Sequence, residues 1–144
     1  MVKKISLNLL IQEIVHGIFA LPFAYLLYKK TGLIDRFGLV IFFTYILDLD
    51  HLVDYFSYYG SKFNLYKFLS GTYFAQSKRA YVFLHAWEWL IILGILSYKS
   101  GWYSLATIIT FAMIPHIIFD SLVVKSFVFY SIIYRSIKKF TDLK

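Results

Sequence analysis

The sequence predicts an all-α fold, a polytopic membrane helical bundle of four spans with additional interfacial helices. Hydrophobic residues make up 60% of the 144 residues and charged residues only 16%, whereas about a quarter of a soluble domain is charged. A chain this short cannot hide so much apolar surface in a soluble core, because small domains have a high ratio of surface to volume. Within lipid, helices satisfy every backbone polar group internally. We therefore expect residues 1–144 to form a single integral membrane domain.

Each of four apolar segments has about the 20 residues that a spanning helix needs. The predicted spans are about residues 5–28, 37–57, 80–98 and 102–124. No small-residue cleavage site follows the first segment, so we interpret it as a retained span. The segments 58–79 and 125–144 mix aromatic residues with Lys and Arg, which is typical of the headgroup layer. We expect interfacial helices there, and the second segment could also form part of a fifth helix.

The basic residues favour one orientation in the membrane. Four spans put both termini and the segment 58–79 on one side, together with eleven basic residues. These are Lys3, Lys4, Lys62, Lys67, Lys78, Arg79, Lys125, Arg135, Lys138, Lys139 and Lys144. The other side has only Lys29, Lys30, Arg36 and Lys99. The positive-inside rule then places both termini in the cytoplasm. The net charge of +7 comes from basic residues at span ends, where they contact anionic lipid headgroups. We therefore expect no nucleic-acid partner.

Ionisable residues within the apolar segments indicate a metal site. All four histidines and six of the eight acidic residues lie in or at the ends of these segments, and no Lys or Arg lies in the middle of one. They are His16, His51, His85, His116, Glu13, Asp48, Asp50, Asp54, Glu88 and Asp120. An unpaired carboxylate in hydrocarbon costs at least ~2.5 kcal/mol on insertion scales. A bound divalent cation would cancel this charge, and the absence of cysteine leaves His and carboxylates as its ligands.

The histidines are paired with acidic residues at helical spacing. The members of each pair are three or four positions apart, which puts both side chains on one face of a helix. The pairs are Glu13 with His16, His51 with Asp54, His85 with Glu88, and His116 with Asp120. In an antiparallel bundle the later three pairs come to one end, and His16 reaches them from mid-depth. Metal-binding helical bundles present their ligands in this way.

We predict eight metal ligands from this pattern. They are His16, Asp48, Asp50, His51, His85, Glu88, His116 and Asp120. Histidine with carboxylate oxygen suits zinc first, with manganese or iron as alternatives, and eight candidates allow one or two ions. Glu88 is the candidate general base, because it follows a ligand histidine by about one turn and has no positive partner in its span. Asp50 is the second candidate catalytic residue, whereas Glu13 and Asp54 stay unassigned.

The run Asp48-Leu49-Asp50-His51, with His16 before it and His85, His116 and Asp120 after it, resembles the LexA-regulated membrane hydrolase family. Members of that family are small inner-membrane proteins predicted to be metal-dependent hydrolases. Their pattern is a first-helix His, a Pro-Asp-x-Asp-His run, a His-Arg…Thr-His-Ser segment and a late His-x-x-x-Asp. This chain departs from it in the middle, where Ala80 replaces the first His and Leu84-His85-Ala86 replaces Thr-His-Ser. The scattered histidines are also similar to the trinuclear-zinc phospholipase C and nuclease fold, which hydrolyses phosphoesters.

These features lead to one main hypothesis and two alternatives. The main hypothesis is a metal-dependent hydrolase at the cytoplasmic face that acts on a phospholipid or a lipid-linked phosphate. Four basic residues could hold the anionic head of this substrate: Lys62, Lys67, Lys78 and Arg79. The first alternative is a metal ion or proton transporter, since His and carboxylates in spans also form relays. It is disfavoured because the candidates gather toward one face. The second alternative is a structural membrane subunit without a metal.

Overall fold

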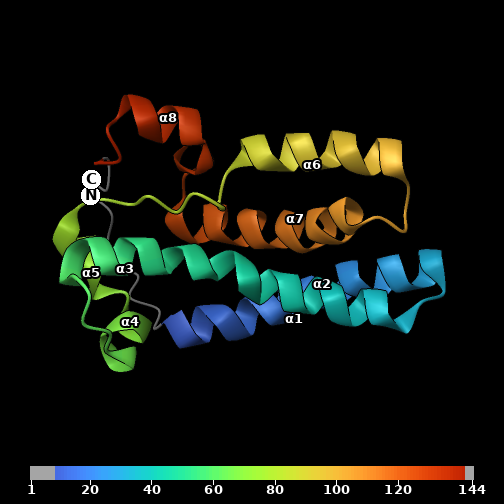
Figure 1. The fold of residues 1–144 in the computed structure, drawn as a ribbon, viewed down its shortest axis with the longest axis horizontal. Coiled ribbons are helices and arrows are strands. Elements are labelled where there is room, and N and C mark those ends of the chain that lie inside the picture. Colours follow the sequence, from blue (N-terminus) through green and yellow to red (C-terminus); the bar gives the residue numbers. More distant parts are fainter. Residues whose placement is uncertain (1–8, 142–144) are drawn as a thin grey trace.

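The computed structural model describes residues 9–141, and every regular element in this range is a helix, as Figure 1 shows. Four helices lie along the long axis in alternating directions: α1 (Leu9–Thr31), α2 (Ile34–Leu47), α6 (Trp87–Ser100) and α7 (Leu105–Val124). The α1–α2 and α6–α7 turns lie at the same end, and each has a glycine with positive φ, Gly32 at 71° and Gly101 at 80°. Glycine adopts this conformation without steric cost. The predicted all-α class is confirmed.

The second predicted span is part of a longer helical rod. After α2, the 3₁₀ turn η1 (Asp48–Asp50) leads directly into α3 (His51–Tyr59), so residues 34–59 are helical without a break. A 3₁₀ turn places side chains three residues apart almost above one another. The rod therefore turns Asp48 and His51 toward the same side of the bundle.

The third predicted span differs from the structure at its start. We expected a helix from residue 80, but α6 begins at Trp87 and has 14 residues. Carboxylates replace helical hydrogen bonds here: Asp54 accepts from the amides of Tyr81 at 2.7 Å and Val82 at 3.1 Å, and Asp50 accepts from Leu84 at 2.7 Å. At 1.5 Å per residue α6 is only about 21 Å long, less than the roughly 30 Å hydrocarbon core.

Two of the described helices are long and apolar enough to cross a membrane, namely α1 over Leu10–Thr31 and α7. The structure therefore shows two candidate spanning helices in the range 9–141, where the sequence predicted four spans. The start of the first predicted span at residue 5 and the end of the tail at residue 144 lie outside the described residues.

Helix α7 is the centre of the packing. It contacts α1, α2 and α6, and one buried cluster joins Ala24 and Leu27 of α1, Val40 of α2, and Ile108 and Ala112 of α7. The alanines allow the helix backbones to approach closely. By contrast, α6 has no fully buried residue. It is therefore an outer helix attached to α7.

Short helices close the end of the bundle opposite the two glycine turns, as Figure 1 shows. They are α4 (Leu65–Ser70), α5 (Thr72–Ser77), η2 (Val128–Tyr130) and α8 (Ile132–Ile137). Tyr55 of α3 and Tyr73 of α5 are fully buried in an aromatic cluster there. Segment 125–141 thus forms short helices and not a fifth long one.

Candidate metal centre

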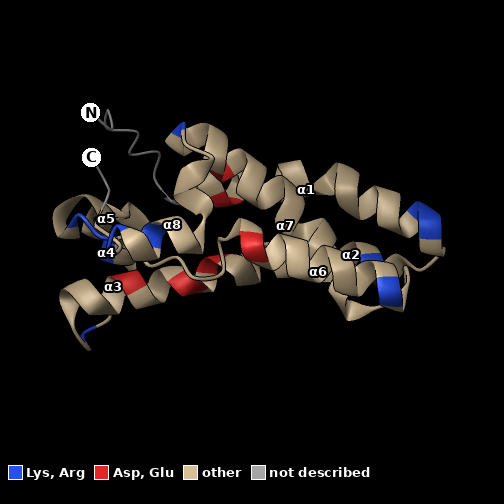
Figure 2. Cartoon of the chain, turned by 90° about the horizontal axis from the view of Figure 1, so that it is seen from above, with Lys and Arg blue, Asp and Glu red and all other residues tan. Residues whose placement is uncertain are grey.

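Seven of the eight predicted ligands lie together in the interior, and we call them the His/Asp cluster. Its members come from α1, η1, α3, the segment before α6, and α7, and each is at most 9% exposed. They are His16, Asp48, Asp50, His51, His85, His116 and Asp120. Figure 2 shows acidic residues of several helices in the same stretch of the long axis, with Lys and Arg at both ends.

Asp48 lies at the centre of the cluster. Its Oδ1 atom is 3.1 Å from Nε2 of His51 and 3.4 Å from Nε2 of both His85 and His116. Its Oδ2 atom is 3.4 Å from Nδ1 of His16. Neither oxygen accepts a hydrogen bond from any described residue, although both are buried. A buried carboxylate without such a bond is costly unless a cation compensates it.

Asp120 lies close to three of the same histidines. Its Oδ1 atom is 2.8 Å from Nε2 of His16. Its Oδ2 atom is 3.5 Å from Nε2 of His85 and 3.6 Å from Nε2 of His116, one turn earlier on α7. The Nε2 atoms of His85 and His116 therefore each lie within 3.6 Å of both aspartates.

Asp50 contacts the outer edge of two imidazoles. Its Oδ2 atom is 3.0 Å from Nδ1 of His85 and accepts a hydrogen bond from the Leu84 amide, and its Oδ1 atom is 3.4 Å from Nδ1 of His51. A carboxylate in this position orients the imidazole and fixes its tautomer, which leaves Nε2 free to bind a metal. This contact favours an orienting role for Asp50, although its Oδ1 atom is buried without a hydrogen-bond partner among the described residues.

The donor atoms fit a divalent cation. Three overlapping groups each bring their ligand atoms within 4.8 Å of one another. They are His16–Asp48–His116, Asp48–His51–His85 and His85–His116–Asp120. Ligands at 2.0–2.2 Å around a tetrahedral zinc ion are roughly 3.3–3.5 Å apart. The distances around Asp48 Oδ1, 3.1–3.4 Å, are close to this spacing. The overlap of the three groups accommodates one ion, or two that share Asp48.

The structure does not bring Glu88 into the cluster. Its half-buried carboxylate accepts hydrogen bonds from the Ser131 hydroxyl and from the amides of Ile132 and Ile133, at 3.1 Å and 3.2 Å for the two amides. Glu88 therefore caps the first turn of α8, where carboxylates stabilise free backbone amides. Neither a ligand role nor a general-base role follows from this position.

The two unassigned acids lie beside the cluster. Glu13 is half-buried on α1, close enough to interact electrostatically with Asp48 and His16. Asp54 uses both carboxylate oxygens to hold the amides of Tyr81 and Val82. It therefore anchors the segment that carries His85.

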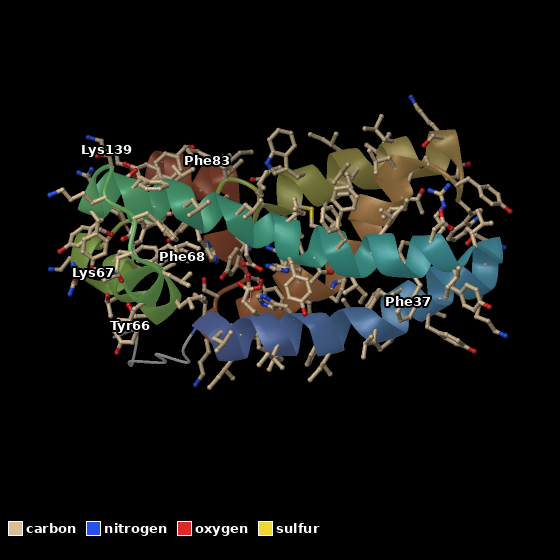
Figure 3. All side chains as sticks on the ribbon, turned by 60° about the horizontal axis from the view of Figure 1, so that its bottom comes forward. Phe37, Tyr66, Lys67, Phe68, Phe83 and Lys139 are labelled. Carbon is tan, nitrogen blue, oxygen red and sulfur yellow. The ribbon has the colours of Figure 1, made fainter. Side chains whose placement is uncertain are left out.

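The four predicted headgroup residues are exposed at the end of the bundle formed by the short helices. Arg79 borders a cavity of about 340 Å³ that Asp54, Ser57, Tyr58, Gln76, Ser77 and Tyr81 also line. Lys62 and Lys67 border a second one of about 320 Å³ with Tyr55, Tyr59, Phe63 and Asn64. In Figure 3, Tyr66 and Lys67 project outward from α4, whereas Phe68 faces inward. Lys78 lines neither cavity.

Two buried residues near the cluster were not predicted. Arg135 of α8 is 2% exposed, and burial lowers the pKa of its guanidinium. Tyr73 of α5 is fully buried, its hydroxyl has no partner among the described residues, and burial followed by the charge of Asp54 raises its pKa. Both belong to mixed aromatic and basic segments, a composition typical of the membrane surface, so no local signal separated them from their exposed neighbours.

Comparisons with known proteins give no relative: no family model, no curated protein and no solved structure matches this chain.

Proposed function

We propose that the chain is a membrane-embedded, metal-dependent hydrolase that acts at the cytoplasmic face on an amphiphilic phosphoester. The observation that carries the proposal is the environment of Asp48. Its carboxylate is 6% exposed, lacks a hydrogen bond from any described residue, and has nitrogens of four histidines within 3.4 Å. A divalent cation is the partner that suits such a set of oxygen and imidazole donors.

The proposed ligands are His51, His85, His116, Asp48 and Asp120. His16 contacts the second carboxylate oxygen of each aspartate, Oδ2 of Asp48 and Oδ1 of Asp120. Zinc suits this set best, and manganese or iron can occupy it as well. A bound ion supplies a water of lowered pKa and polarises a phosphoryl oxygen. Asp50 keeps His85 and His51 in the orientation that presents Nε2 to the centre.

The outer surface supports a membrane location. Large apolar side chains are exposed along α1 and α6, among them Ile18 at 56%, Leu26 at 58% and Ile91 at 63%. An exposed apolar surface of this kind requires lipid or a partner protein. In the proposed arrangement the continuous rod 34–59 crosses the membrane beside α1 and α7, and α6, which is too short to span alone, crosses it together with the segment 80–86 that precedes it. The count of basic residues supports cytoplasmic termini, and the resemblance to the LexA-regulated membrane hydrolase family supports the inner membrane.

A lipid phosphoester is the proposed substrate class for three reasons. The cluster belongs to a chain with a lipid-compatible surface, so a substrate dissolved in the membrane can reach it. The two cavities beside exposed Arg79, Lys62 and Lys67 offer cations to an anionic head. The sequence pattern of His and Asp residues also resembles that of the LexA-regulated membrane hydrolases, and this resemblance supports hydrolysis.

Metal content is the first test. The protein is purified in detergent, and zinc, manganese and iron are measured by elemental analysis for the wild type, His51→Ala and Asp35→Asn. Asp35 is an exposed acid that pairs with Arg36, so its variant is a control for charge. We expect about one or two ions per chain in the wild type and the control, and a large loss in His51→Ala.

Hydrolysis is the second test. Wild type and His51→Ala are reconstituted in vesicles of anionic phospholipid, and released phosphate or headgroup is measured with the bound metal present. Hydrolysis by the wild type alone supports the proposal. A wild-type protein without stoichiometric metal would overturn it. Metal without hydrolysis of any lipid phosphoester would instead favour a transporter or a structural subunit.

A further inference from the structure

Arg135 holds the segment that carries His85. Its Nη1 atom donates hydrogen bonds to the carbonyl oxygens of His85 at 3.1 Å and Phe129 at 2.9 Å, and its Nη2 atom donates to the carbonyl of Val82 at 3.0 Å. The guanidinium thus joins both ends of the turn Val82–His85 to η2. The turn is tight, because the His85 amide donates to the Val82 carbonyl at 3.0 Å and Val82 has φ of 29°.

This arrangement is unusual for a buried cation. Arg135 is 2% exposed, and a charge removed from water is costly unless it is paired. Among the described residues its hydrogen-bond partners are three neutral backbone carbonyls. Three donors in a fixed planar fork match three carbonyls that point in different directions, which a lysine ammonium on a flexible stem cannot reproduce.

We propose that Arg135 is a positioning residue that fixes the turn Val82–His85 and thereby aims His85 at the metal centre. The turn belongs to no helix or sheet, so side chains satisfy much of its backbone. Asp54 and Asp50 accept hydrogen bonds from its amides, and Arg135 donates to its carbonyls. With amides and carbonyls both held, the His85 ring keeps its Nδ1 atom on Asp50 and its Nε2 atom near Asp48 and His116.

A reciprocal contact holds Arg135 itself in place. Glu88, three residues after His85, caps the start of α8 through Ser131, Ile132 and Ile133. Helix α8 then returns Arg135 to the turn that precedes Glu88. The two charged residues of opposite sign therefore lock the C-terminal helix onto the ligand segment, and neither contributes an atom to the metal groups.

Direct contact with a substrate does not explain Arg135. The guanidinium is enclosed, with one face on the Phe129 ring at 5.7 Å from its centroid, and its exposed fraction leaves no surface for a ligand. Its influence on a reaction must therefore pass through His85.

The test compares Arg135→Lys and Arg135→Gln with Arg36→Gln, a control at the far end of α2. Amide hydrogen exchange of residues 81–86 is measured in metal-free protein, which requires no ion. We expect exchange of this segment to rise at least tenfold in both Arg135 variants, while α7 keeps its protection and Arg36→Gln resembles the wild type. Unchanged exchange in residues 81–86 would overturn the proposal.

A metal arm, which rests on the proposed function, measures the affinity for Co²⁺ and its absorption spectrum. We expect affinity to fall about 10–100-fold in Arg135→Lys, as for residues that orient a ligand, with an altered spectrum. A wild type that binds no Co²⁺ would refute the proposed function, and the exchange measurement would still decide the role of Arg135. If Arg135→Gln unfolds by circular dichroism, Arg135→Lys and Glu88→Gln decide instead. If Arg135→Lys and Glu88→Gln both keep the wild-type Co²⁺ affinity and the wild-type exchange of residues 81–86, the proposed positioning role of Arg135 is wrong.

Discussion

The Nε2 atoms of His85 and His116 lie 2.8 Å apart, although 31 residues separate them in the chain. Only one of the two nitrogens can carry a proton in such a contact. Asp50 accepts from Nδ1 of His85, which leaves the Nε2 lone pair of that ring directed at His116. A shared tetrahedral ion needs roughly 3.3–3.5 Å between ligands, so the two rings must separate by about half an ångström when they bind one. The cluster is therefore close to a binding geometry.

The first prediction separates ligands from orienting residues. Asp48→Asn removes the carboxylate at the centre of the cluster, and we expect loss of stoichiometric metal. Asp50→Asn leaves that carboxylate in place but weakens the contact to Nδ1 of His85. We expect it to retain the wild-type number of ions with affinity reduced about 10–100-fold. Competition with a chelator of known affinity measures both, and equal losses in the two variants would show that Asp50 is itself a ligand.

The second prediction concerns Glu88. Because its carboxylate caps α8, Glu88→Gln should leave the metal stoichiometry unchanged. It should lower the free energy of unfolding by about 1–2 kcal/mol, since hydrogen bonds to a charged acceptor are the stronger ones. Chemical denaturation in mild detergent, followed by near-ultraviolet circular dichroism, gives the free energy. Full stability together with a missing ion would restore the ligand role that the sequence predicted.

Much of the centre was predictable because helical spacing depends on local sequence. The pair His116 and Asp120 lies on one face of α7 as a spacing of four residues requires. Alternating helix directions brought the remaining histidines to the same depth. The local sequence Asp48-Leu49-Asp50-His51 therefore predicted that these side chains lie at the same depth in the bundle as the other histidines.

The differences between the predicted and observed positions have one physical origin. Residues 80–86 were assigned to a span by hydropathy and Glu88 to the metal site by its spacing from His85, and neither criterion reveals how a backbone finds its hydrogen bonds. In the structure, Asp54 and Arg135 satisfy the backbone of this segment from 28 and 53 residues away in sequence, measured to Val82. Partners so distant leave no periodic signal. Arg135 was predicted to lie at the membrane surface for the same reason.

The third prediction tests how α1 and α2 pack beside the cluster. Gly17 follows His16, and a Cβ atom there would overlap the Tyr45 hydroxyl, whereas a Cβ at Gly38 would meet nothing within 4 Å. Both glycines lie within helices, so the difference in helix propensity between glycine and valine contributes equally to the stability of both variants. We expect Gly17→Val to lower stability by about 1 kcal/mol relative to Gly38→Val, the low end of the range for overpacking, because the overlap is with the outer end of the partly exposed Tyr45 side chain. Thermal unfolding of the two variants in the same detergent measures the difference, and equal midpoints would mean that Tyr45 moves aside freely.

The fourth prediction concerns recognition of an anionic head. Arg79 and Lys67 border separate cavities at the end of the bundle that holds the short helices, and both are exposed. Within the described residues, neither makes a hydrogen bond or an ion pair with the His/Asp cluster, so neutralising them should change substrate binding and not metal binding. With anionic phospholipid vesicles as substrate, we expect Arg79→Gln and Lys67→Gln to raise KM about three- to tenfold each with little change in kcat, because an interaction equal in ground and transition states affects KM alone. Lys99→Gln is the matched control, because Lys99 lies in the last turn of α6, at the end of the bundle away from the short helices. An equal rise in KM in this variant would indicate a general effect of surface charge instead of a headgroup site.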